Sequence, residues 1–127
     1  MKIDKKILHV NYSDNLGGAA ISCVRLLNAQ IKNNLNSWLF TCDKKIDSER
    51  IFSLDGKHEI MDHKIKMKLS RLLVKFFERK KITKSISLFN SLAIKKINLF
   101  DCDIVNLHWI CNEMISIENI KKINKPL

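Results

Sequence analysis

The sequence predicts an α/β fold, with a mostly parallel, Rossmann-like sheet and helices on both of its faces. Three nearly all-apolar runs, at 7–10, 37–41 and 104–107, are too short to be helices. They lack the polar–apolar alternation of a half-exposed sheet, which is typical of parallel strands covered by helices on both sides. An amphipathic segment separates the first two runs, as in a β-α-β unit. A chain of 127 residues is long enough for one domain with a core.

The first strand and the first helix are joined by a polar loop that ends in two glycines. Residues 11–15 are polar and turn-prone, and Gly17 and Gly18 follow them. A helix is predicted from about residue 19 to 33, because apolar residues recur there at helical spacing. Asparagines can adopt the left-handed conformation that ends a helix, and three follow in this region: Asn33, Asn34 and Asn36.

The rest of the chain gives weaker signals, and then the α/β pattern returns. A long basic helix with an apolar stripe is predicted in the middle, and Ser116 is a suitable N-cap for the last helix. In chain order, the remaining predicted elements are a short strand over 51–54, the basic helix over 58–82, a short helix over 90–98, a buried strand over 104–107, a helix over 117–123, and the lead-in to a further strand at 124–127.

Strand, glycine loop and helix is an arrangement that brings backbone N–H groups up to a phosphate. A tight βα turn without any ligand is the simpler interpretation of Gly17 and Gly18. A dinucleotide site is a third possibility, since Asp43 lies about where a ribose-binding acid would be. We rank the dinucleotide site last of the three, because the motif G-x-G-x-x-G is absent and the loop is too long for that fingerprint.

The net charge of +10 and the pI of about 9.6 favour an anionic partner, although a lysine-rich solvated surface would give the same totals. Cations flank the apolar stripe of the basic helix, as in a helix that lies on anionic lipid. The alternative is a stripe that packs on the domain, with solvated lysines around it. Nucleic-acid binding ranks last, because no recognition motif accompanies the charge. The residues expected to face a membrane are Lys68, Arg71, Lys75 and Arg79.

The cysteines and histidines give no sign of a metal site or of a disulfide framework. The four cysteines are widely spaced, without a C-x-x-C pair, and no signal peptide precedes them, so we expect reduced thiols in a cytoplasmic protein. Neither they nor the four histidines have zinc-ligand spacing. No run is long enough to span a membrane. His9, within the first strand, is expected to be a buried structural histidine.

Three blocks in this order resemble a known family: residues 6–20 with their glycine loop, Asp103-Ile-Val-Asn-Leu-His-Trp-Ile110, and residues 116–126. Together they resemble the N-terminal domain of family-4, GT-B-type retaining glycosyltransferases of bacterial polysaccharide synthesis. The Leu-His-Trp block is the most specific of the three, and the likeness is loose over 42–99. The resemblance implies two Rossmann-like domains that face each other across a cleft.

The resemblance also implies roles for individual residues. Gly17 and Gly18 match the loop that approaches the diphosphate of a nucleotide-sugar donor, and His108 and Trp109 match a strand end on the acceptor side. Asn15 is assigned to that acceptor side as well. The implied acceptor is a glycan or a lipid-linked sugar, at the inner face of the membrane. No metal cofactor is implied, because the resemblance is to GT-B enzymes.

The chain departs from the family pattern in three ways. It has Asn106-Leu-His108 where relatives tend to carry His-x-His, and Cys111-Asn-Glu113 where they often have glycines. It also ends before the second domain, so residues 1–127 are expected to be part of an N-terminal domain that does not transfer sugar alone. A non-catalytic module that binds an acceptor, a membrane or a partner is the alternative function.

Overall fold

The computed structural model describes residues 5–77 and 87–127, and it has the α/β, Rossmann-like architecture that the sequence predicts. Its four strands are all parallel and follow the order β3-β2-β1-β4 across the sheet. Their bounds are β1 Lys6–Val10, β2 Asn36–Thr41, β3 Ile51–Ser53 and β4 Ile104–Leu107.

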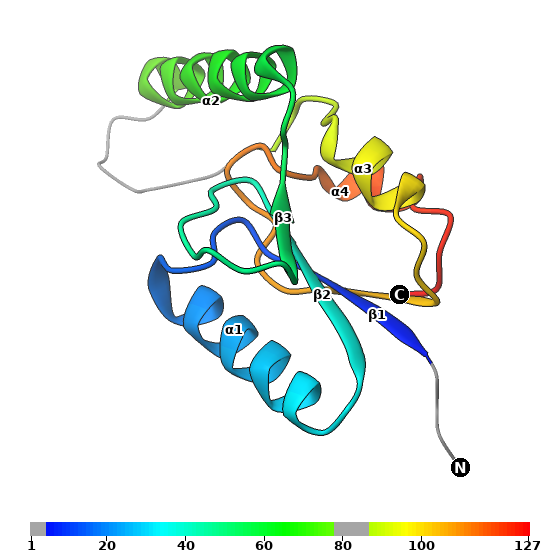
Figure 1. Ribbon diagram of the computed structural model, residues 1–127. Coiled ribbons are helices and arrows are strands. Elements are labelled where there is room, and N and C mark those ends of the chain that lie inside the picture. The colour runs from blue at the N-terminus through cyan, green and yellow to red at the C-terminus, as the bar shows by residue number, and fades with distance from the viewer. Residues whose placement is uncertain (1–4, 78–86) are drawn as a thin grey trace.

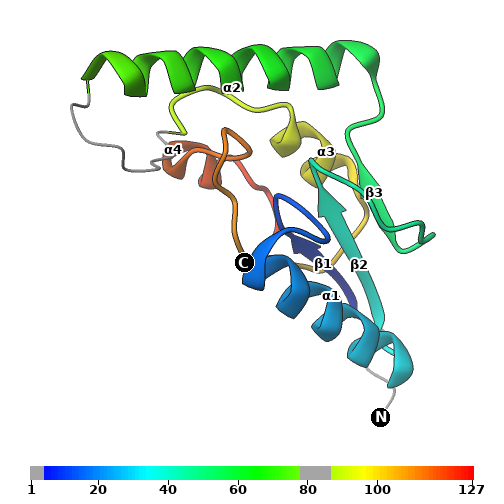
Figure 2. The same ribbon diagram turned by 90° about the vertical axis from the view of Figure 1, so that its left-hand side faces the viewer.

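Helices cover both faces of this sheet, as the sequence predicts, and one further helix crosses the sheet's carboxyl edge (Figures 1 and 2). Helix α1 packs on one face, whereas α3 and α4 lie on the other. The long α2 runs past the ends of the strands, near the loops that follow β1, β2 and β3. The helices are α1 Gly17–Lys32, α2 Lys57–Phe77, α3 Ala93–Leu99 and α4 Ile117–Ile120.

The two faces of the sheet bury separate apolar clusters, because successive side chains of a strand point in opposite directions. Cys23 and Leu27 of α1 pack on Leu39 and Ile51 on one face. The larger cluster on the other face joins the sheet to α3 and to the last third of the chain. Its fully buried members include Leu8, Val10, Phe40, Ala93, Ile97, Val105 and Met114.

The observed elements differ from the predicted ones mainly at their ends. The prediction of a buried strand over 104–107 is wrong in part, because β4 is the last strand in the order and its residues Ile104 and Asn106 are exposed. Helix α1 begins at Gly17, two residues earlier than predicted, and Asn34 after it has the expected left-handed backbone, with φ of 62°. Helix α4 begins after Ser116 as predicted but ends at Ile120, because the chain turns there through the bond from the Ile123 N–H to the Ile120 carbonyl.

The predicted lead-in to a further strand lies beside β4. The Val105 N–H donates to the Pro126 carbonyl over 2.8 Å, although no strand is formed over 124–127. The predicted basic helix is present as α2 from Lys57 to Phe77, and the part of the prediction after residue 77 lies outside the described residues.

Candidate functional site

The strand order defines one position on the carboxyl edge where ligands commonly bind. From β1 the chain proceeds outward to β2 and β3, and it then returns to place β4 on the opposite side of β1. The loops after β1 and β4 therefore lead away from each other, toward opposite faces of the sheet. Open α/β sheets bind ligands in the crevice outside such a switch point. Here the two loops are the glycine loop and the segment that contains His108 and Trp109.

The glycine loop leaves the N-terminus of α1 open to solvent. Residues 15–19 are exposed, and no side chain among the described residues caps the helix at Leu16. Gly17 has φ of +85°, a conformation that other residues rarely adopt, whereas Gly18 has no such requirement. Apart from the adjacent residues and the nearby backbone of α1 itself, no described atom lies within 4 Å of a Cβ placed on either glycine. Packing within the described residues therefore does not explain why Gly18 lacks a side chain.

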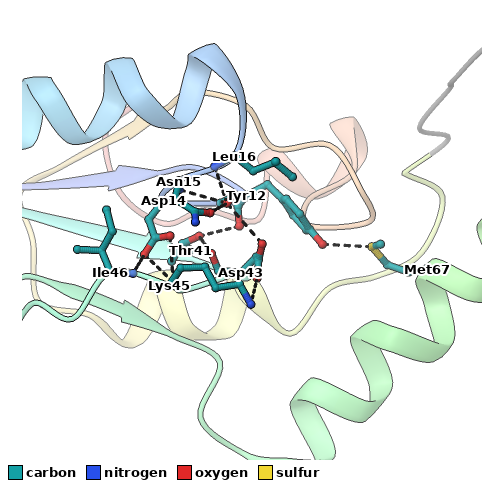
Figure 3. A network of polar contacts seen from close by, with 10 residues as sticks. Tyr12, Asp14, Asn15, Leu16, Thr41, Asp43, Lys45, Ile46 and Met67 are labelled. Atoms are coloured by element: carbon teal, nitrogen blue, oxygen red, sulfur yellow. Dashed lines mark hydrogen bonds and ion pairs between the residues drawn. The ribbon is translucent and has the colours of Figure 1, made fainter.

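Buried polar side chains fix the loop that precedes these glycines (Figure 3). The Ser13 hydroxyl accepts hydrogen bonds from the N–H groups of Asn15 and Leu16, at 3.3 and 3.2 Å. The buried carboxylate of Asp14 accepts bonds from the backbone N–H groups of Lys45 and Ile46, at 2.8–3.0 Å. The loops after β1 and β2 are thereby joined, so the exposed helix N-terminus is held on a rigid support.

Trp109 connects the loop after β4 to the loop after β1. The backbone N–H of Trp109 donates to Oδ1 of Asn11 over 2.9 Å, and the backbone carbonyl of Trp109 accepts from the Tyr12 N–H over 2.8 Å. The rings of Tyr12 and Trp109 meet edge to face, with centroids 5.8 Å apart. Trp109 remains 42% exposed, so an aromatic surface is available at this edge.

His108 lies on the other side of the strand end from Trp109. Its Nε2 is 3.0 Å from Nδ1 of His9, and Nε2 of His9 is 2.7 Å from the Gln30 side-chain oxygen on α1. Burial, and to a lesser extent the neighbouring His9, lower the pKa of His108 below its ordinary value, so the ring is neutral at pH 7. His9 is completely buried, as the sequence predicts.

A pocket of about 400 Å³ lies between α2 and the strand ends. Tyr12, Asp43 and Leu54 line it from the sheet side, and the Tyr12 hydroxyl is 3.5 Å from the Met67 sulfur of α2. Burial raises the pKa of Tyr12, as do the neighbouring Cys42 and Asp43, so its hydroxyl stays protonated. The α2 side contributes His63, Lys64, Lys68 and Arg71, among other residues.

Several of these pocket residues were not identified from the sequence as site residues. The sequence pattern places Tyr12 only in a polar loop, and it relates Asp43 only to a dinucleotide site. Their positions directly after β1 and β2 are the signal that could have identified them, since ligands bind at that edge. His63 gave no such signal, because its position depends on where α2 crosses the sheet.

Helix α2 packs through its more polar side and exposes its apolar stripe. Its one buried residue is Ser70, and His63 and Met67 are half-buried. Lys68, Arg71 and Lys75 are exposed beside the stripe, whereas Arg79 lies outside the described residues. The sequence left open whether the stripe packs on the domain, and among the described residues most of it does not. Its exposed members are Ile65, Leu69, Leu72, Phe76 and Phe77, at 43–84% exposure.

The cysteines are free thiols in the part of the chain that the structure describes. Burial raises the pKa of both Cys23 and Cys42 to about 12, so neither is a thiolate nucleophile at neutral pH. Cys23 nevertheless lies close to His9 and His108, an arrangement that their spacing in the sequence did not indicate.

Comparison with known proteins gives no relative for this chain: no protein-family model, no curated protein and no solved structure matches it. Within the described ranges, no helix is both long enough and apolar enough to cross a bilayer.

Proposed function

We propose that this chain is the acceptor-side, N-terminal part of a GT-B-type retaining glycosyltransferase, which moves a sugar from a nucleotide-diphosphate donor to a glycan or lipid-linked acceptor. One observation carries the proposal: an uncapped helix N-terminus and an unobstructed Gly18 lie at the switch point of a parallel sheet. Backbone N–H groups at such a position bind phosphate, and the helix dipole favours negative charge there.

The donor side and the acceptor side of the site have different roles in the transfer. The N–H groups at the start of α1 stabilise the diphosphate as it departs, an electrostatic contribution that needs no proton transfer from this chain. The exposed Trp109 ring beside Tyr12 offers an apolar face to a sugar. Lys68 and Arg71 line the pocket under α2, where they would meet an acceptor phosphate.

Binding of pyrophosphate and uridine diphosphate, followed through backbone amide resonances in NMR spectra, tests the donor side. We expect the largest shifts at Gly17, Gly18 and Ala19. Gly18→Ala should weaken binding at least about fivefold, because its methyl group occupies the space through which the phosphate approaches. Gly18 is the suitable probe, since the backbone of Gly17 would be strained by any side chain.

Gly56→Ala is the matched control, because it makes the same change at the remaining glycine, beside Glu59 at the start of α2. It should leave pyrophosphate binding unchanged. Equal binding by the wild type and Gly18→Ala, or shifts that avoid residues 15–19, would refute the donor-side assignment.

The exposed stripe of α2 favours a second candidate function, a non-catalytic module that binds an anionic membrane. An apolar stripe flanked by exposed cations is the pattern of an interfacial helix. Sedimentation with anionic and neutral vesicles at low salt is the test. The double variant Lys68→Glu/Arg71→Glu should lose most binding to anionic vesicles, because it replaces two positive charges at the surface with two negative ones.

A double variant of α1, Arg25→Glu/Lys32→Glu, is the charge-matched control, since both residues are exposed on a different helix. It should retain vesicle binding. Equal sedimentation with neutral and anionic vesicles would exclude the membrane function. A chain that binds vesicles but not pyrophosphate would support this candidate over the glycosyltransferase.

A further inference from the structure

Three side chains with the chemistry of metal ligands converge beneath the switch point, on the face of the sheet that α1 covers. They come from three elements: His9 from β1, Cys23 from α1, and His108 from the end of β4. One ligand atom of each lies within 4.8 Å of the other two. Their separations in the sequence are 14 and 85 residues, so no spacing motif could have indicated the group.

The hydrogen bonds around His9 leave one of its nitrogens available to a metal. Gln30 Oε1 can only accept, so His9 Nε2, 2.7 Å away, carries the proton. The other nitrogen, Nδ1, is then unprotonated and accepts hydrogen bonds from Nε2 of His108 at 3.0 Å and from the Asn106 side-chain amide at 3.4 Å. A metal ion would replace these donors at Nδ1, and the His108 proton would move to that ring's own Nδ1. A metal-binding histidine usually donates its second N–H to a carbonyl or carboxylate, which orients the ring. Gln30 supplies that contact here.

From this geometry we infer that His9, Cys23 and His108 bind a divalent transition-metal ion of the zinc class. Two imidazoles and a thiolate match zinc, whereas magnesium and calcium prefer oxygen ligands. Tetrahedral zinc at about 2.0–2.1 Å from each nitrogen would hold the two nitrogens about 3.3 Å apart. The observed nitrogen separation of 3.0 Å differs from this value by only a few tenths of an ångström. The Cys23 sulfur, within 4.8 Å of the nitrogens, would have to approach them by up to about 1 Å to complete the site.

The surroundings of the three ligands suit a site with one open position. His9 and Cys23 are fully buried, but His108 is half-buried and its neighbour Asn106 is exposed, so water has access from the β4 side. Three protein ligands and one water is a frequent zinc coordination. The ion would displace the Cys23 thiol proton, and it would join β1, α1 and β4. This inference does not depend on the proposed glycosyltransferase function.

Cobalt(II) is the probe, because it replaces zinc and reports thiolate ligation in its absorption spectrum. The 127-residue chain, without a histidine tag, is stripped with a chelator under reducing conditions, checked by circular dichroism, and titrated. We expect one cobalt to bind per chain and a thiolate-to-cobalt charge-transfer band to form in the near ultraviolet. Added zinc should displace the cobalt and abolish this band. Zinc should also raise the midpoint of thermal unfolding, since it binds the folded chain.

Variants assign the ligands. Cys23→Ala should abolish the charge-transfer band, and His108→Gln, at a half-buried position, should weaken cobalt binding at least about tenfold. Gln30→Ala should weaken binding by a similar factor while the band stays, because Gln30 only positions His9. Cys111→Ala is the control and should leave both the band and the affinity unchanged.

Two results would overturn the inference. A folded wild-type chain that takes up no cobalt would show that His9 and His108 form only a hydrogen-bonded pair. A charge-transfer band that persists in Cys23→Ala would assign the metal to other cysteines. If Cys23→Ala does not fold, His108→Gln decides, since undiminished cobalt affinity in that variant would equally refute the site.

Discussion

Asp103 connects the start of β1 to the turn before β4 through its side chain. Its carboxylate accepts a hydrogen bond from the Lys6 N–H over 2.8 Å, and the Lys5 ammonium lies 3.6 Å away. The hydrogen bond, and then the Lys5 charge, lower the pKa of Asp103 below its ordinary value. A lowered carboxyl pKa stabilises the fold above the unfolded-state value of about 4 and ceases to do so as the pH falls through the folded-state value.

Asp103→Asn should therefore be less stable than the wild type at pH 7, and this difference should shrink as the pH falls below about 4. Urea unfolding at several pH values measures it. Asp101→Asn is the neighbouring control, because its side chain is almost fully exposed, with the Lys6 ammonium 3.7 Å away. A stability difference between Asp103→Asn and the wild type that is constant with pH would contradict the expected role.

Asp14 joins the glycine loop to the loop after β2 through its buried carboxylate. Asp14→Ala should lower the free energy of unfolding by about 2–4 kcal/mol, because the N–H groups of Lys45 and Ile46 lose a buried charged acceptor. Asp47→Ala, at an exposed position in the same region, should cost less than about 0.5 kcal/mol. Denaturant unfolding of both variants tests this, and equal losses would show that the Asp14 bonds contribute little.

Helix α1 offers a matched test of how one element is held to the sheet. Leu27 is 1% exposed and packs on Leu39 and Ile51, whereas its neighbour Leu26 is 39% exposed. Leu27→Ala should cost about 2–5 kcal/mol of stability, because it leaves a cavity. Leu26→Ala should cost less than about 1 kcal/mol. Chemical unfolding of the two variants measures these losses of stability. Similar losses would mean that α1 is rotated about its axis, so that it does not pack on the sheet mainly through Leu27.

The two long helices differ in how well the sequence predicted their packing. The apolar stripe of α1 predicted its buried side correctly, since Ala20, Cys23 and Leu27 are all buried. In α2 the equivalent stripe is largely exposed, and Ser70 is buried instead. Helical periodicity identifies an apolar face, but it does not say whether the sheet or another surface covers that face.

At the scale of the whole molecule, the strand order predicts how local stability is distributed. Strand β1 is hydrogen-bonded on both sides, to β2 and β4, whereas β3 is a short strand with β2 as its one neighbour among the described strands. Backbone amides of β1 should exchange with solvent at least about tenfold more slowly than those of β3. Hydrogen-exchange NMR measures both. Equal protection of the two strands would indicate that the sheet opens only as one unit.

The pattern of residues predicted most of the elements, because strand and helix signals are local. The three apolar runs became β1, β2 and β4, and Gly17 and Gly18 fall at the start of α1. The candidate site was predicted only in part. Gly18 and Trp109 lie at the carboxyl edge of the sheet, as expected. The side chain of His108 does not lie beside the Trp109 ring but contacts His9, whereas Trp109 packs against Tyr12.

By itself, the sequence determined the α/β class, the order of the elements and the glycine loop, since each depends on residues within about one element's length. Only the tertiary structure decided that β4 lies beside β1, that α2 crosses the carboxyl edge, and that Cys23 meets His9 and His108. These features bring together residues up to about a hundred positions apart. They depend on which surfaces pack together across the whole chain, and local periodicity does not encode that choice.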